Sequence, residues 1–441
     1  MTTHVLFDSD DIVVHYQEGS REFILVTFIG IGHEANAGAT YFGKPVVEAD
    51  NIACLGVTTR KRNWYYSNNM HTALRVMQRV MAEYEKTVTI GLSAGAYAAI
   101  KYAGMLGSER TLALGPQWTI DDQEGEVIPE WAALCEPSMR GMGVKPGDLH
   151  GEIYALFDRH HRSDTATVGR LLDYATGHER AQLLPVNVPS AGHIVFESLK
   201  GSNNLRELIA ILVSKDEATI CADNLRRATS RMRRSNTTNL YNRIANGYTR
   251  FPKLVYDMLV SQGFRERFNY RDVLRDETLL FRICAQLGRN GYMAQAQILL
   301  RSLISYYATG EFRPGGADHL VMGTPVMLDH RGRTLGYSSR HRHFTSSNIV
   351  WMEGDATPVS LVHIDHKAYP CVTICGRKFF LDREGDQIRA LASPGGLHAE
   401  CRGATCGIRD VEDRYLTVVG DREMTWSTQQ HSFETFSVVT V

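Results

Sequence analysis

The sequence predicts an α/β domain, then a helical segment, then a β-rich domain. Three changes of pattern lead to this division. Up to about residue 213, short apolar runs alternate with segments of helical periodicity, which is typical of a mostly parallel sheet with crossover helices. The periodicity then becomes helical only, and in the last part of the chain it becomes β. We therefore expect an α/β domain at 1–215, a helical domain or linker at 216–312 and a β-rich domain at 313–441.

The composition is that of an ordinary globular protein. Hydrophobic residues make up 43% of the 441 residues, charged residues 22%, and the net charge is -1. This balance lacks the basic excess of nucleic-acid-binding proteins, so we expect no nucleic-acid partner. The first residues, MTTHVLFDSDDIVVHY, do not resemble a secretion signal, and no apolar run is long enough to span a membrane. We expect a cytoplasmic protein of undetermined oligomeric state.

In the first domain the pattern predicts the order β-β-β-α-β-α-β-β-α-β-α. The expected strands are Ile12–Tyr16, Phe23–Phe28, Asn51–Val57, Val88–Gly91, Thr111–Leu114, Glu152–Phe157 and Leu183–Val188. The expected helices are Met70–Tyr84, Ala94–Leu106, Ala166–Tyr174 and Phe196–Val213. Amphipathic segments continue into the second domain, where the expected helices are Ala218–Arg234, Asn239–Ala245, Phe251–Gln262, Arg271–Leu287 and Ala294–Tyr307.

The last domain contains three stretches that can be laid over one another, beginning at Val326, Val372 and Ile408. Each has a strand, a polar turn and a second strand, and such a threefold repeat predicts a β-trefoil. The first copy is poor, so a plain β-sandwich is the alternative. Four aromatic residues could stack on sugar rings, although core positions are the simpler interpretation for most of them: Tyr337, Trp351, Tyr415 and Trp426.

The last four cysteines form a CxxxC pair and a CxxxxC pair. A four-sulfur zinc site is conceivable from these two pairs, but neither has the common two-residue spacing. We therefore expect buried, small, apolar side chains instead of a metal site. The four residues are Cys371, Cys375, Cys401 and Cys406.

A candidate nucleophile lies in the first domain, in the stretch GLSAG from Gly91 to Gly95. Ser93 is expected at a sharp turn between a strand and a helix, the context of a nucleophile elbow. Side chains at either flank would collide with the strand or the helix, which explains the two glycines. A plain turn serine is the alternative interpretation.

A serine nucleophile needs a base and an acid that orients it. His193 fits the base, because it lies in a loop after the last expected strand and before the closing helix. For the acid, Asp164 is favoured over Asp158 because it comes a few residues beyond a strand and shortly before a helix. Whichever is not the acid is expected to cap a helix or form a turn. His160 and His161, between them, could line the mouth of the site, but as adjacent residues they are expected at the surface.

An oxyanion hole requires two backbone N–H donors. One is expected from Ala94, the residue after the nucleophile. The other is expected from the loop after an earlier strand, with Ile29 or Gly30 as the donor, because the glycines there let the backbone approach a substrate. This chemistry requires no metal and no cofactor.

Several of these stretches together resemble the α/β-hydrolase-fold serine enzymes of bacterial surface-polysaccharide loci. They are Asn63-Trp-Tyr65, IGLSAGAYAA from Ile90, LALGPQ from Leu112, Phe157-Asp158 with Asp164, and Gly192-His193. Some members are similar to capsular polysaccharide O-acetyltransferases, which implies acetyl-CoA as a co-substrate. The end of the chain resembles fascin-like and lectin-like trefoils. The usual elbow of the group has Met-Gly-Gly after the serine, where this chain has Ala94-Gly-Ala.

The leading hypothesis is therefore an esterase that forms an acyl-enzyme at Ser93 and acts on an acylated carbohydrate or small molecule. The alternative within acyl transfer is an acetyl-CoA-dependent polysaccharide O-acetyltransferase. A non-catalytic, carbohydrate-binding scaffold is the alternative of another class.

Overall fold

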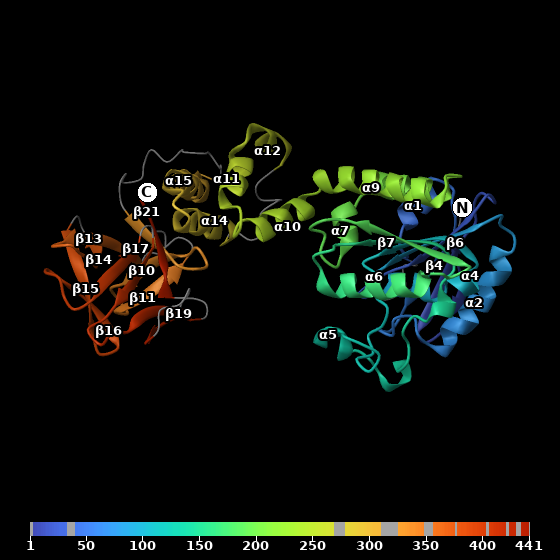
Figure 1. The fold of residues 1–441 in the computed structure, drawn as a ribbon, viewed down its shortest axis with the longest axis horizontal. Helices are drawn as coiled ribbons and strands as arrows, with labels where there is room; N and C mark the ends of the chain where they lie inside the picture. The colour runs from blue at the N-terminus through green and yellow to red at the C-terminus, as the bar shows by residue number, and fades with distance from the viewer. Residues whose placement is uncertain are drawn as a thin grey trace. The chain divides into compact units, whose positions relative to one another are not determined.

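The computed structural model describes residues 3–32, 40–268, 278–309, 325–347, 356–374, 377–402, 405–419, 423–428 and 434–440. The chain divides into two compact units, Met1–Asn242 and Arg243–Val441. An α/β unit is followed by a unit that combines helices with a β-rich part (Figure 1). Within the described ranges, no helix has the length and apolar character needed to cross a membrane.

The first unit is built on a mixed sheet. Its described strands lie in the order β1-β2-β4-β3-β5-β6-β7-β8. Neighbours from β4 to β8 are parallel, and β1 and β2 pair antiparallel. All seven expected strands are found, with β1 in addition. The strands are β1 (His4–Asp8), β2 (Ile12–Gln17), β3 (Ile24–Phe28), β4 (Ala53–Thr59), β5 (Thr87–Leu92), β6 (Ser108–Leu114), β7 (Gly151–Phe157) and β8 (Ala181–Asn187).

Helices cover both faces of this sheet (Figure 1). Side chains of α2, α3 and α6 belong to the apolar core on one face, and those of α1, α8 and α9 to the core on the other. The helices are α1 (Lys44–Ala49), α2 (Asn68–Met81), α3 (Ala94–Lys101), α4 (Ala103–Leu106), α5 (Pro129–Ala132), α6 (Arg162–Ala175), α7 (Val195–Leu199), α8 (Ser202–Val213) and α9 (Ala218–Arg234). The helix expected from residue 196 is split, because Gly201 has a φ of 140° that helical residues do not adopt.

Helix α9 belongs to the α/β unit, although a boundary was expected at residue 215. Its apolar face, with Cys221, Leu225 and Met232, is buried in the same core as Val186 of β8. Burial of this face against the sheet therefore extends the first unit beyond residue 215, and the unit ends at Asn242. The described helices that follow are α10 (Thr237–Gly247), α11 (Pro252–Val260), α12 (Gln262–Arg267), α14 (Thr278–Arg289) and α15 (Met293–Thr309).

The β-rich part of the second unit is an antiparallel sheet in which the first described strand, β9, pairs with the last, β21. Helix α14 packs on it, where Ser437 Oγ donates to the carbonyl of Ala285 at 3.0 Å. The strands are β9 (Pro325–Leu328), β10 (Thr334–Ser338), β11 (His343–Ser347), β12 (Ala356–Pro358), β13 (Ser360–Ile364), β14 (Lys367–Ile374), β15 (Arg377–Glu384), β16 (Gln387–Leu391), β17 (His398–Arg402), β18 (Thr405–Arg409), β19 (Tyr415–Val419), β20 (Glu423–Ser427) and β21 (Phe436–Thr440).

Two hairpin turns of this sheet are built alike. Asp329 and Asp410 each accept hydrogen bonds through Oδ1 from two backbone N–H groups of their own turn, and through Oδ2 from an arginine four residues later. Equivalent turns in separate hairpins are consistent with an internal repeat. The β-trefoil itself stays a prediction.

The aromatic and cysteine side chains of the β-rich part have mixed surroundings. Tyr337 is a core residue, as expected, while Trp426 is half-buried under the guanidinium of Arg383. Trp351 and Cys375 lie outside the described residues. Cys371 and Cys406 are buried, but the expectation of burial is wrong for Cys401, which is exposed at the end of a hairpin.

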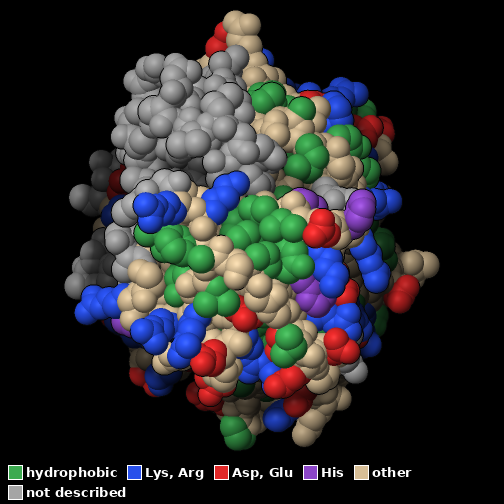
Figure 2. Space-filling model, turned by 90° about the vertical axis from the view of Figure 1, so that its left-hand side faces the viewer, with side chains coloured by type: hydrophobic (Ala, Val, Ile, Leu, Met, Phe, Trp, Pro, Cys, Tyr) green, Lys and Arg blue, Asp and Glu red, His purple; other side chains and the backbone are tan. Residues whose placement is uncertain are grey.

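Figure 2 shows the face of the molecule at the β-rich end. Hydrophobic side chains gather in its central area, and both basic and acidic side chains surround them. The charges of the described residues on this face are therefore interspersed and do not form a surface of one sign.

We predict that Gly95→Ala lowers the stability of the α/β unit. The added Cβ would lie 2.3 Å from the carbonyl oxygen of Phe28, so the helix must move away from the sheet at a cost of about 2 kcal/mol or more. For a unit of this size the melting temperature should fall by about 4–8 °C. Gly169→Ala on α6 is the control, because its Cβ meets no atom within 4 Å. An unchanged melting temperature in Gly95→Ala would contradict the packing argument.

Candidate active site

Ser93 occupies the turn between β5 and α3. Its backbone has φ 51° and ψ -114°, a strained conformation for a residue with a side chain. A Cβ on Gly91 would lie 2.1 Å from the carbonyl oxygen of Gly95, so the two flanking glycines touch each other. The expected steric role of the glycines is confirmed. The turn holds the serine hydroxyl at the carboxyl end of the strand.

A chain of hydrogen bonds leads from Ser93 to a buried carboxylate. Ser93 Oγ lies 2.8 Å from His193 Nε2, and His193 Nδ1 lies 2.8 Å from Asp164 Oδ1. Asp164 is fully buried, and His193 is 14% exposed through its side chain. With the imidazole proton on Nδ1, Nε2 accepts the serine hydrogen and Nδ1 donates to the carboxylate. This arrangement can move a proton away from the serine hydroxyl.

Asp158 and Asp164 have separate environments. Asp164 lies in the first turn of α6, where it contacts His193. Asp158 directly follows β7 and is also buried, but its carboxylate accepts from the backbone N–H groups of His160 at 3.0 Å and Gly192 at 3.1 Å. Asp158 therefore ties the loop after β7 to the loop that carries the histidine.

His161 is a second histidine on the same carboxylate. Its Nδ1 lies 3.0 Å from Asp164 Oδ1 and 3.4 Å from the backbone nitrogen of Asp164, as the cap of α6. A protonated Nδ1 can donate to the carboxylate, and an unprotonated one can accept from the N–H. The hydrogen bond to Asp164 raises the pKa of His161. The sequence placed this residue at the surface, and only the tertiary structure brings it to Asp164.

The two expected groups of oxyanion donors line one pocket. Ala94, at the N-terminus of α3, lines it together with Ile29 and Gly30 from the loop after β3. A Cβ on Gly30 would lie 3.7 Å from Cβ of Ser93, so this loop runs beside the serine. Because the first N–H groups of a helix have no partner within the helix, Ala94 can offer one to a ligand. Both groups of expected donors therefore lie at the same pocket beside Ser93.

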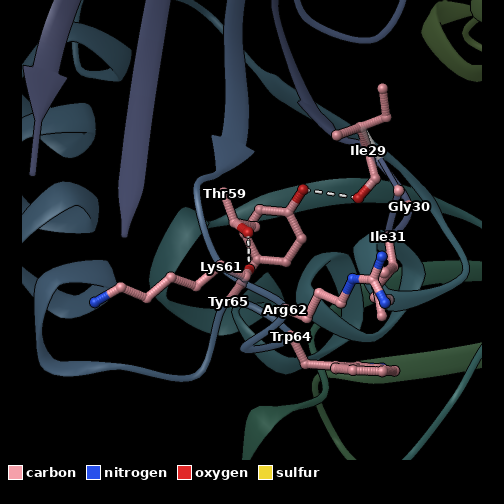
Figure 3. Close-up of a pocket in the computed structure, with 10 residues that line it drawn as sticks. Ile29, Gly30, Ile31, Thr59, Lys61, Arg62, Trp64 and Tyr65 are labelled. Carbon is pink, nitrogen blue, oxygen red and sulfur yellow. Dashed lines mark hydrogen bonds between the residues drawn. The ribbon is translucent and has the colours of Figure 1, made fainter. Parts of the chain in front are cut away.

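The remaining wall of the pocket comes from the segment after β4, shown in Figure 3. Tyr65 Oη donates to the carbonyl of Ile29 at 2.7 Å, and Trp64 Nε1 donates to Gln117 Oε1 at 2.8 Å. Both residues have positive φ angles and are fully buried. Arg62 and Ile31 also line the pocket (Figure 3). Tyr65 thus fixes the loop that carries the expected donors, a role that the sequence analysis missed.

Two further residues surround the histidine. A Cβ on Gly115 would lie 2.3 Å from the carbonyl oxygen of His193, so this glycine permits a close approach of the two loops. The ring of Trp131, from the short helix α5, lies 4.6 Å from the imidazole centroid. No periodic signal in the sequence distinguishes Trp131, because it lies in an irregular connection between β6 and β7.

Metal-ligating side chains also meet here. Among the described residues, His161, Asp164 and His193 place their ligand atoms within 4.8 Å of one another. These nitrogens and this carboxylate oxygen are the same atoms that form the hydrogen bonds above. A metal bound here would therefore compete with the contacts that both histidines make to Asp164.

We predict that His161 contributes to stability mainly at acidic pH. Its pKa is raised in the folded protein, so the stabilisation is complete below the unfolded value of about 6.5 and is lost as pH rises through the folded value. His161→Phe should therefore lower the melting temperature more at about pH 5.5 than at about pH 8.5. The matched control is His160→Phe, at the exposed neighbouring position. An equal effect of His161→Phe at both pH values would argue against the carboxylate contact.

No model of a known protein family matches the chain, and no curated protein matches it in sequence. Some solved structures resemble part of it. An esterase of Pyrococcus furiosus is 12% identical, with 52% of this chain and 92% of that chain covered at a TM-score of 0.33. A capsule O-acetyltransferase of Neisseria meningitidis serogroup A is 10% identical, with 47% and 93% covered at 0.35. A structure of SeviL bound to the asialo-GM1 saccharide is 13% identical, with 27% and 97% covered at 0.21.

Proposed function

We propose that the chain is a serine enzyme of the α/β-hydrolase type that acts on ester bonds through an acyl-enzyme at Ser93. The observation that carries this proposal is the hydrogen-bond chain from Ser93 through His193 to Asp164. A serine in a surface turn has no need of a strained backbone, two colliding glycine positions and a histidine that contacts a buried carboxylate.

In the proposed reaction, His193 Nε2 takes the proton of Ser93 Oγ as the oxygen attacks the ester carbonyl. Asp164 stabilises the resulting imidazolium through the hydrogen bond from Nδ1. The carbonyl oxygen becomes negative and is stabilised by the N–H groups of Ala94 and of Ile29 or Gly30. The imidazolium then gives its proton to the leaving alcohol, and the acyl group remains on Ser93.

Two versions of this function differ in the donor and the acceptor of the acyl group. In the favoured version, water attacks the acyl-enzyme and the protein is an esterase of an acylated carbohydrate or small molecule. In the alternative, acetyl-CoA supplies the acyl group and a sugar hydroxyl accepts it. Both versions use the same residues, because they differ only in what donates and what receives the acyl group. The proposal that the substrate or acceptor is a carbohydrate rests on the sequence resemblance given above.

We predict that a fluorophosphonate probe labels the wild-type protein and that Ser93→Ala abolishes the labelling. Hydrolysis of a simple acetyl ester should fall by about 10³-fold or more in the same variant. Ser67→Ala is the matched control, because Ser67 caps α2; it should cost about 1 kcal/mol of stability and leave labelling intact. A folded wild-type protein that neither reacts with the probe nor hydrolyses esters would favour the non-catalytic scaffold.

The transferase version is tested with acetyl-CoA. Release of free thiol that depends on a polysaccharide acceptor and on Ser93 would favour transfer. Ester hydrolysis without any turnover of acetyl-CoA would favour the esterase.

We also predict different outcomes for the two aspartates. Asp164→Asn should lower kcat by roughly 10³- to 10⁴-fold, because the amide cannot stabilise the imidazolium of His193. Asp158→Asn keeps an acceptor oxygen for only one of the two backbone N–H groups and turns an amide donor toward the other. We therefore expect a loss of stability and at most about a tenfold effect on kcat. Measuring kcat and the melting temperature for both variants separates these roles. A larger kcat loss in Asp158→Asn would reverse the assignment.

A further inference from the structure

One pair of cysteines in the β-rich part lies outside everything that the proposed function uses. Strands β17 and β18 form a hairpin, and Cys401 pairs directly with Cys406 across it. Directly opposed residues of an antiparallel pair point to the same face of the sheet. The two thiols are therefore neighbours.

The register places this pair where a disulfide fits. Two residues connect Arg402 to Thr405, and the pair that flanks a two-residue connection is hydrogen-bonded. The next pair, Cys401 with Cys406, is then of the non-hydrogen-bonded kind, with Cα atoms roughly 4.5 Å apart. This separation lies within the range of about 4.4–6.8 Å that disulfides span.

The two cysteines differ in access. Two residues back along the same face, Ala399 and Ile408 pair within the apolar core. Cys406 continues this core, while Cys401 is exposed. A reagent from solution therefore reaches the exposed Cys401 before the buried Cys406.

The ionisation of the pair favours the same order of events. The thiol of Cys406 donates a hydrogen bond to the sulfur of Cys401, which lowers the pKa of Cys401 to about 7. The same hydrogen bond, followed by burial, raises the pKa of Cys406. A thiol is most effective in disulfide exchange when its pKa is near the ambient pH. Among the other cysteines that the structure describes, burial raises the pKa of those at positions 54, 135, 221, 284 and 371.

We propose that Cys401 and Cys406 are a redox-active dithiol that a low-molecular-weight disulfide, such as oxidised glutathione, converts into an intramolecular disulfide. The thiolate of Cys401 attacks one sulfur of glutathione disulfide, whose S–S bond breaks, and one glutathione thiolate leaves. The sulfur of Cys406 then loses its proton and attacks the sulfur of Cys401, and the second glutathione leaves. The protein loses two electrons and two protons, and one glutathione disulfide becomes two glutathione molecules.

The test is a peptide map of the full-length chain after incubation with glutathione disulfide near neutral pH, acid quenching and alkylation of the remaining thiols. Trypsin cuts after Arg402, so the two cysteines fall in separate peptides, Ala390–Arg402 and 403–409. We expect these two peptides to be joined by a disulfide that dithiothreitol breaks. Two unlinked, alkylated peptides alongside glutathione on Cys135 would overturn the proposal.

Variants separate the two roles. Cys406→Ala should stop at the mixed disulfide of glutathione with Cys401, and Cys401→Ser should leave Cys406 unmodified in the folded protein. Alkylation of Cys401 by iodoacetamide should be half-maximal near pH 7 in the wild type, and this midpoint should move to higher pH in Cys406→Ala. Linked peptides formed equally fast in the urea-unfolded chain, or an unmoved midpoint, would contradict the geometric argument. Cys135→Ser, at a half-buried cysteine elsewhere in the chain, should leave the linkage unchanged.

Discussion

The close approach of helix α3 to strands β3 and β5 is the constraint on which the candidate site depends. The helix begins immediately after the strand, and its backbone at Gly95 lies against the carbonyl of Phe28. This contact leaves Ser93 in a strained conformation at the end of β5 and brings the first N–H of the helix beside the loop after β3. A wider spacing would relax the backbone of Ser93 and separate the serine from the proposed oxyanion donors. Because Gly91 and Gly95 have no side chains, the helix can approach the strands closely enough to hold Ser93 in its strained conformation.

The other half of the site comes from the carboxyl ends of β7 and β8. Parallel strands end at the same edge of the sheet, so the loops that follow them carry Asp164 and His193 to Ser93. Asp158 joins the two loops through Gly192. Asp164, the proposed acid, is therefore held against His193, and Asp158 connects the two loops around it. The sharing of Asp164 Oδ1 by His161 and His193 adds a second titrating group beside the proposed base.

In the β-rich part of the second unit, antiparallel pairing determines which residues are neighbours. Its antiparallel hairpins place residues opposite one another in fixed register, and that register turns two cysteines five positions apart into direct neighbours. Two of its hairpin turns are held in the same way, because Asp329 and Asp410 each accept hydrogen bonds from backbone N–H groups of their own turn. Helix α14 shares a compact unit with this sheet, and the division between the two units falls within α10.

The sequence by itself determined the order of the α/β elements and the local chemistry of the elbow. Both depend on short-range information: the periodicity of apolar side chains and the glycines on either side of Ser93. It could also place His193, Ala94 and the loop at Ile29 near Ser93, because their positions relative to strand ends follow from the order of elements. The sequence did not predict the boundary at Asn242, because only the packing of the structure shows that α9 covers the sheet.

The tertiary structure alone decided which side chains meet. Asp158 and Asp164 are six positions apart, and the sequence favoured Asp164 only by its place shortly before a helix. The direction in which the loop turns after β7 brings Asp164, and not Asp158, to His193. His161 and Tyr65 also acquire their partners through space, from loops whose conformation has no periodic signature. Periodicity reports which face a residue lies on, and contacts between distant loops depend on the packing of every element between them.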